Sequence, residues 1–121
     1  REIDSRLPLI QADPQMLMMV FKNLLLNAIE ALDAGGNIYV KASGIDDGIL
    51  VTFKDEGCGI SSENLKTIFR PFFSMKRQGH GLGLAMVRKA ITLHKGHISV
   101  ESKEGVGSTF SIWIPADLEK R

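Results

Sequence analysis

The chain has 121 residues, of which 44% are hydrophobic and 24% charged, and its formal charge is +1. These values are typical of one globular domain and exclude collagen-like, disordered and disulfide-stapled proteins. A net charge this small also produces no electrostatic field strong enough to indicate a nucleic-acid-binding protein. Cys58 is the single cysteine, which favours a reducing, cytoplasmic setting without a cysteine metal cluster.

The first expected elements are a short strand at residues 7–12 and a long helix that begins after Asp13. An aspartate followed by proline favours a helix start, because the carboxylate accepts from free amides and proline fits the first helical position. Apolar residues at three- and four-residue steps continue to Leu32 and predict one buried helix face. Polar residues interrupt this segment, so it cannot span a bilayer, and Gly35 follows its end.

Four more strands are expected where apolar and polar residues alternate, and they pair into two hairpins. Their ranges are 38–43 and 49–54, joined at 46–48, and 98–100 and 110–114, joined at 104–107. A short helix capped by Ser61 or Ser62 would end at Ile68. After a loop, a second long helix would run from Leu82 to Lys95 and stop at Gly96.

This order of elements predicts an α/β two-layer sandwich in one domain spanning residues 1–121. We expect a mixed, mostly antiparallel sheet of about five strands, covered on one face by about three helices. Such an arrangement leaves space between the helices and the loops at the sheet edge.

Three polar residues of the first long helix, Asn23, Asn27 and Glu30, lie at spacings of four and three and share one face. Their oxygens could hold magnesium, which keeps several waters and needs few protein ligands. The alternative is a solvated helix flank.

Asp55 follows a strand and precedes two alternate glycines, Gly57 and Gly59. A flat ligand could lie against such a backbone while the acid accepts from its amino group. The alternative is an ordinary loop, since aspartate and glycine are common in turns.

Glycines 79, 81 and 83 precede the second long helix. Their amides and the positive helix end favour phosphate binding, to which Lys76 and Arg77 could add charge. No Gly-Lys-Ser/Thr tripeptide of a Walker loop occurs. A dinucleotide fold would need a strand before the glycines, although Glu101, eighteen residues after Gly83, keeps that alternative open.

The segment Gly105 to Phe110 is expected to be a hairpin turn, and a hydroxyl of Ser108 or Thr109 could reach a ligand directly or through water.

With these segments in order, the chain resembles the catalytic ATP-binding domain of sensor histidine kinases, in the superfamily that includes gyrase and a heat-shock chaperone. The resemblance rests on an asparagine box (23–28), three glycine boxes (55–60, 79–84, 105–110) and a phenylalanine box (68–73). It implies a Bergerat-type fold that binds ATP and Mg2+.

The resemblance also implies residue roles. Asp55 would accept from the adenine amino group, Asn27 would ligate magnesium with Asn23 as a second candidate ligand, and both asparagines would be catalytic. The implied nucleotide-binding set is Asn23, Asn27, Glu30, Asp55, Gly57, Gly59, Ile60, Phe73, Lys76, Arg77, Gly79, His80, Gly81, Leu82, Gly83, Leu84, Ser108 and Thr109. Phe73 would anchor a short lid at about 74–80, similar to that of nitrogen-regulatory kinases. Glu30 and His80 depart from the common pattern.

A kinase is favoured over a hydrolase because gyrase-like relatives hold a general-base glutamate where this sequence has Asn23, and an amide cannot take a proton from water in that way. The γ-phosphoryl would go to a histidine on a separate dimerisation domain, and then to a response regulator. No histidine here is followed by an acidic residue, so we expect a monomeric C-terminal fragment of a homodimeric kinase, able to bind ATP but lacking its acceptor.

Two other functions stay open. One is an interaction module that senses ATP through lid closure, and the other is a serine kinase similar to anti-sigma factors of this superfamily.

Overall fold

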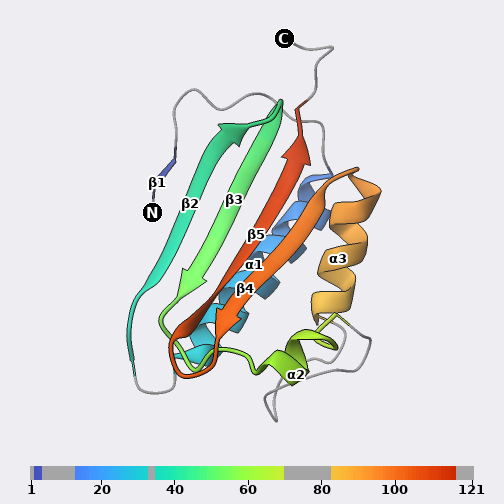
Figure 1. Cartoon of the computed structure of the whole chain (residues 1–121). Helices are drawn as coiled ribbons and strands as arrows, with labels where there is room; N and C mark the ends of the chain where they lie inside the picture. The colour runs from blue at the N-terminus through green and yellow to red at the C-terminus, as the bar shows by residue number, and fades with distance from the viewer. Residues whose placement is uncertain (1, 4–12, 33–34, 70–82, 117–121) are drawn as a thin grey trace.

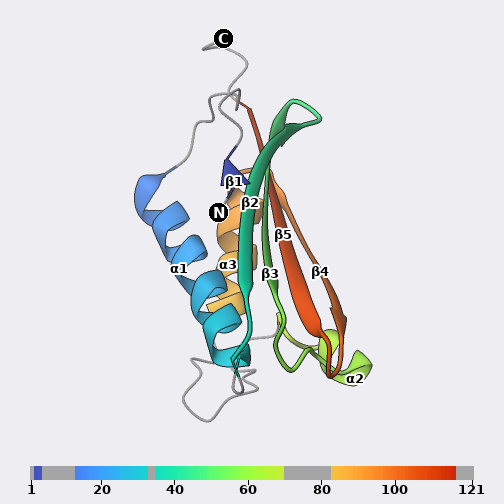
Figure 2. The same cartoon turned by 90° about the vertical axis from the view of Figure 1, so that its left-hand side faces the viewer.

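A computed structural model describes residues 2–3, 13–32, 35–69 and 83–116 of the chain. The elements are β1 (Glu2–Ile3), α1 (Pro14–Ala31), β2 (Ile38–Ile45), β3 (Gly48–Asp55), α2 (Ser62–Leu65), α3 (Gly83–Leu93), β4 (His97–Lys103) and β5 (Gly107–Pro115). In this part of the chain the strands form one sheet in the order β1-β2-β3-β5-β4, antiparallel except between β1 and β2. Helices α1 and α3 pack together on one face of the sheet (Figures 1 and 2). The mostly antiparallel two-layer sandwich is therefore confirmed.

Helix α1 begins and buries its face as its sequence predicts. Oδ1 of Asp13 accepts from the backbone of Gln15 at 2.9 Å, which satisfies an amide that the first helical turn leaves free. Val20, Leu24 and Ala28, four residues apart, are almost fully buried. Within the described residues, no helix is long and apolar enough to cross a membrane.

The first hairpin is longer than its sequence pattern indicates, because only two residues form its turn. Asp46 and Asp47 have φ angles of 52° and 59°. Positive φ at both central residues is what the favoured two-residue hairpin turn requires. Gly48 therefore belongs to β3 and pairs with Ile45. The strand expected at residues 7–12 lies outside the described residues, and β1 pairs with β2 instead.

The end of α3 corrects a detail of the sequence analysis. The helix ends at Leu93, and Lys95 rather than Gly96 adopts the left-handed conformation, with φ 63°. The amide of Gly96 donates to the carbonyl of Ile91 at 2.9 Å, as in a Schellman motif. Gly96 is needed for another reason: a Cβ at this position would collide with the carbonyl oxygen of Trp113 on β5.

The core lies between the two helices and the inner face of the sheet. Alternate residues of β5 point toward the helices, so Phe110, Ile112 and Ile114 are at most 5% exposed. Helix α2 is one turn capped by Ser61, shorter than predicted, and it lies at the end of the sheet rather than over its face (Figures 1 and 2). At that end the loop after β3 meets the turn after β4, where the amide of Gly105 donates to the carbonyl of Cys58 at 2.7 Å.

Candidate functional site

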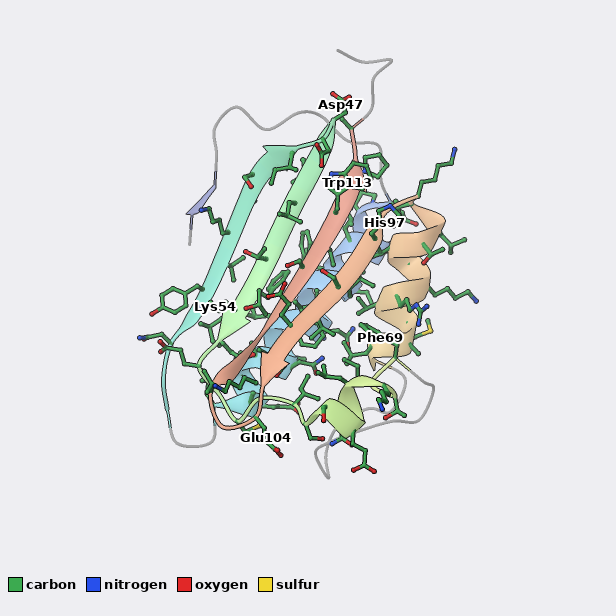
Figure 3. All side chains as sticks on the ribbon, viewed as in Figure 1. Asp47, Lys54, Phe69, His97, Glu104 and Trp113 are labelled. Atoms are coloured by element: carbon green, nitrogen blue, oxygen red, sulfur yellow. The ribbon has the colours of Figure 1, made fainter. Side chains whose placement is uncertain are left out.

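Asp55 and Ser108 lie directly opposite each other at one end of the sheet. Asp55 is the last residue of β3, and its register partner on β5 is Ser108. Both are on the inner face and buried, with 4% and 6% of their surfaces exposed. The turn that carries Glu104 lies at this end, whereas Asp47 and Trp113 lie at the other (Figure 3).

The Asp55 carboxyl is an acceptor held in place by the backbone. Its Oδ1 accepts from the amide of Gly57 at 2.9 Å. Burial raises the pKa of this carboxyl, and backbone hydrogen bonds from Gly57 and Ser108 oppose that increase. A buried, ionised carboxyl has several acceptor positions and is suited to an amino group of a ligand.

Gly57 brings the loop after β3 onto the end of α1. The amide of Cys58 donates to the carbonyl of Ala31 at 3.0 Å. A Cβ on Gly57 would lie 2.6 Å from the carbonyl carbon of Ala31, so the two backbones can approach only because this residue has no side chain.

Gly59 and Gly107 have comparable packing roles. Gly59 has a φ of 71°, and its Cβ would lie 2.8 Å from the carbonyl carbon of Lys103. A Cβ on Gly107 would collide with the carbonyl oxygen of Asp55. Gly57 and Gly59, predicted to let a ligand approach, thus also fix the loop after β3 to α1 and β4, and Gly107 brings β5 against the end of β3.

A stripe along α1 connects this loop to the start of α3. Asn23, Asn27 and Ala31 follow at steps of four and lie on one side of the helix. Ala31 contacts the loop after β3, while Oδ1 of Asn23 would be 2.9 Å from a Cβ on Gly83, the first residue of α3. Asn27 therefore lies along α1 between the residues that contact Gly57 and Gly83, and it is half-buried.

The Asn23 carboxamide presents its oxygen toward α3. Its Nδ2 donates to the carbonyl of Met19 at 2.8 Å, which leaves Oδ1 as the atom nearest Gly83. Oxygen is the ligand that magnesium prefers, so the donor set suits this ion. In the described part of the chain, no group of three or more His, Cys, Asp or Glu side chains could hold a metal.

The other predicted residues divide into three groups. Glu30 is half-buried on α1, Ile60 is buried beside Asp55's loop, and Leu84 packs against the core. Thr109 pairs with Lys54 on the outer face of the sheet, and strand alternation directs it away from Asp55, so we leave it out of the site. Phe73, Lys76, Arg77, Gly79, His80, Gly81 and Leu82 lie outside the described residues.

The sequence analysis missed Ser102 of β4. Its Oγ accepts from the amide of Ile60 at 2.7 Å and lies 2.7 Å from Oγ of Ser108. A signal was available, because Ser102 follows Ile98 and Val100 at steps of two along β4 and should therefore face inward with them. A hydroxyl at such a position needs hydrogen-bond partners.

The chain is similar to known proteins in both sequence and fold. The family model described as "Histidine kinase-, DNA gyrase B-, and HSP90-like ATPase" matches residues 12–118. Sensor histidine kinase ZraS of Escherichia coli K12 is 45% identical over the whole chain, and sporulation kinase E of Bacillus subtilis is 44% identical over 90% of it. The chain spans 27% and 15% of these two relatives.

Two solved structures share the fold. The catalytic domain of histidine kinase ThkA, in a nucleotide-free form, superposes with a TM-score of 0.84 and 38% identity, over 99% of this chain and 79% of that one. Full-length ShkA, solved in complex with AMPPNP, gives a TM-score of 0.80 and 30% identity, over 93% of this chain and 24% of that one.

Proposed function

Because the chain belongs to the family of histidine kinase-, DNA gyrase B- and HSP90-like ATPases, we propose that it is the ATP-binding catalytic domain of a sensor histidine kinase. In this proposal residues 1–121 form one domain that presents the γ-phosphate of ATP to a histidine on a separate dimerisation domain. The chain spans about a quarter of ZraS, so the activity of the whole kinase is part of the proposal.

The observation that carries the proposal is the buried pair of Asp55 and Ser108 beside a loop fixed to α1. An adenine ring can insert its amino group here, with Asp55 as the acceptor. The AMPPNP complex of ShkA supports an adenine nucleotide as the ligand. Gly59 would border the base, since its left-handed backbone already turns the loop at this point.

The stripe of α1 would then face the phosphates. Asn27 and the Oδ1 of Asn23 are the oxygens that we assign to Mg2+, and Glu30 continues the same side of the helix. Bound magnesium would neutralise phosphate charge and help to orient the triphosphate. We assign further phosphate contacts to Lys76, Arg77, His80 and the amides of residues 79–84.

Transfer to histidine requires little chemistry from this domain. An imidazole nitrogen of the acceptor would form the new bond to the γ-phosphorus as the bond to the bridging oxygen breaks, and ADP would leave with that electron pair. The domain would contribute position and charge neutralisation. Asn23 supplies no general base for water, which favours transfer over hydrolysis.

The described histidines of this chain do not suit the acceptor role. Nε2 of His94 accepts from the amide of Asp13 at 3.0 Å, and its Nδ1 lies 2.8 Å from the carbonyl of Ala90. His97 stacks on Trp113, with ring centroids 5.7 Å apart. We therefore assign the acceptor to another domain of a homodimeric, cytoplasmically facing kinase, with a response regulator as the next partner.

Two measurements test the proposal. The chain should bind AMPPNP with magnesium, and Asn27→Ala should weaken this binding at least tenfold, whereas Gln15→Ala, at an exposed position of the same helix, should not. With labelled ATP, phosphate should appear on an added histidine-bearing dimerisation domain and should be lost in acid. No nucleotide binding, or an acid-stable phosphoserine, would contradict the proposal.

A further inference from the structure

The hydroxyl of Ser102 makes three polar contacts at the end of the sheet beside Asp55. Its Oγ lies 2.7 Å from the amide nitrogen of Ile60, 3.0 Å from the carbonyl oxygen of Gly107 and 2.7 Å from Oγ of Ser108. Ser102 thus joins the loop after β3 to both residues that begin β5.

Counting hydrogens fixes the direction of these bonds. The amide of Ile60 can only donate and the carbonyl of Gly107 can only accept, while each hydroxyl has one hydrogen. All three contacts are satisfied together only if Ser102 donates to Gly107 and Ser108 donates to Ser102. The reverse direction between the serines would leave the partly buried Gly107 carbonyl facing the Ser102 oxygen without a hydrogen between them, which is unfavourable.

In that arrangement the Ser108 hydroxyl has no hydrogen for a ligand and offers only lone pairs. Its cross-strand neighbour Asp55 is also an acceptor when ionised. Two adjacent acceptors suit a base edge that carries an amino group, and they repel a carbonyl oxygen at the same place.

We propose that Ser102 is a positioning residue for base specificity: through its bonds to Gly107 and Ser108 it keeps the Ser108 hydroxyl an acceptor, and so favours a 6-amino purine over a 6-oxo purine. This inference rests on the proposed nucleotide-binding function. Ser102 itself does not touch the base. Without its hydroxyl, Ser108 could turn its hydrogen toward the ligand and tolerate a carbonyl.

The test compares ATP with inosine triphosphate, which carries a carbonyl where ATP carries the amino group. Binding of each in magnesium is measured by calorimetry on the whole chain and on Ser102→Ala, Ser108→Ala and the double variant. Ser102→Thr, which keeps the hydroxyl, is the rescue variant. Ser99→Ala is the matched control, because Ser99 lies on the outer face of the same strand.

We expect Ser102→Ala to reduce the preference for ATP over inosine triphosphate by about three- to tenfold, the effect of about one hydrogen bond. Ser102→Thr should retain the preference, and the double variant should lose no more than Ser108→Ala, because Ser102 acts through Ser108.

An equal loss of affinity for both nucleotides in Ser102→Ala, or additive losses in the double variant, would overturn the inference and leave Ser102 a structural residue. Either result leaves the proposed function intact, provided that the unmodified chain binds ATP. If the unmodified chain binds neither nucleotide, the proposed function itself is refuted.

Discussion

Replacing Asp55 by asparagine should separate nucleotide binding from folding stability. The raised pKa of this carboxyl means that its surroundings, on balance, favour the neutral form. Asparagine has the same shape and resembles a protonated carboxyl, with one acceptor and one donor group. We therefore expect the free energy of unfolding of Asp55→Asn at neutral pH to equal or exceed that of the unmodified chain.

Binding should respond in the opposite way. The asparagine oxygen can keep the bond from Gly57 that Oδ1 of Asp55 accepts at 2.9 Å, which places the amide nitrogen where the ligand's amino group would donate. Losing a hydrogen bond to a charged acceptor costs about 1.5–3 kcal/mol. That cost corresponds to a loss of affinity for AMPPNP of about 10- to 150-fold.

The pH dependence of stability gives an independent check. A carboxyl whose pKa rises on folding from the ordinary 3.8 contributes stability that is fully present below 3.8 and is lost as the pH rises through its folded pKa. Between about pH 3.5 and about pH 7.5, the unmodified chain should therefore lose stability that Asp55→Asn does not lose.

Urea unfolding at both pH values, together with calorimetry of AMPPNP binding, measures these effects. Glu101→Gln is the control, since Glu101 is exposed on β4 and its register partner is Thr109 on the outer face. If Asp55→Asn unfolded several kcal/mol more easily at neutral pH, or bound AMPPNP unchanged, the reasoning about this buried acceptor would be refuted.

Three more variants test the packing around the site. Gly59→Ala should lower the free energy of unfolding, measured in urea, by about 2–4 kcal/mol, because it adds a Cβ against Lys103 in left-handed backbone. Gly105 is the control: its φ is 82°, but a Cβ there would have nothing within 4 Å. Gly105→Ala should therefore cost only about 1 kcal/mol. Gly83→Ala should displace the side chain of Asn23 and so weaken magnesium-dependent binding of AMPPNP severalfold. The melting temperature should stay within a few degrees of that of the unmodified chain, and a large drop would contradict this prediction. His94→Ala should cost about 0.5–1.5 kcal/mol, because it removes the bond from the Asp13 amide and the side-chain contact to the Ala90 carbonyl. Unchanged unfolding would show that this link between helices is dispensable.

The elements that the sequence predicts well are those specified by local patterns. Asp13 and Pro14 identify the start of α1, and the alternation around Phe110 identifies β5, because capping and strand periodicity act over a few residues. The end of α3 was misassigned to Gly96 because the close approach of Trp113 comes from a strand seventeen residues later in the chain.

The site was predictable only in part for the same reason. Asp55 and Ser108 are both predicted as site residues, but that they lie opposite each other is apparent only from the register of β3 and β5. That register also separates Thr109 from the site. Ser102 required both the strand pairing and the position of Ile60, neither of which local sequence contains.

The strand β5 is inserted between β3 and β4 although it is the last of the three in the chain. During synthesis, Asp55 would leave the ribosome long before Ser108, and the sheet would lack the strand that joins β3 to β4 until then. A nascent chain could therefore not capture nucleotide early. Addition of AMPPNP to ribosome-bound intermediates should protect them from proteolysis only after residues 107–115 have emerged.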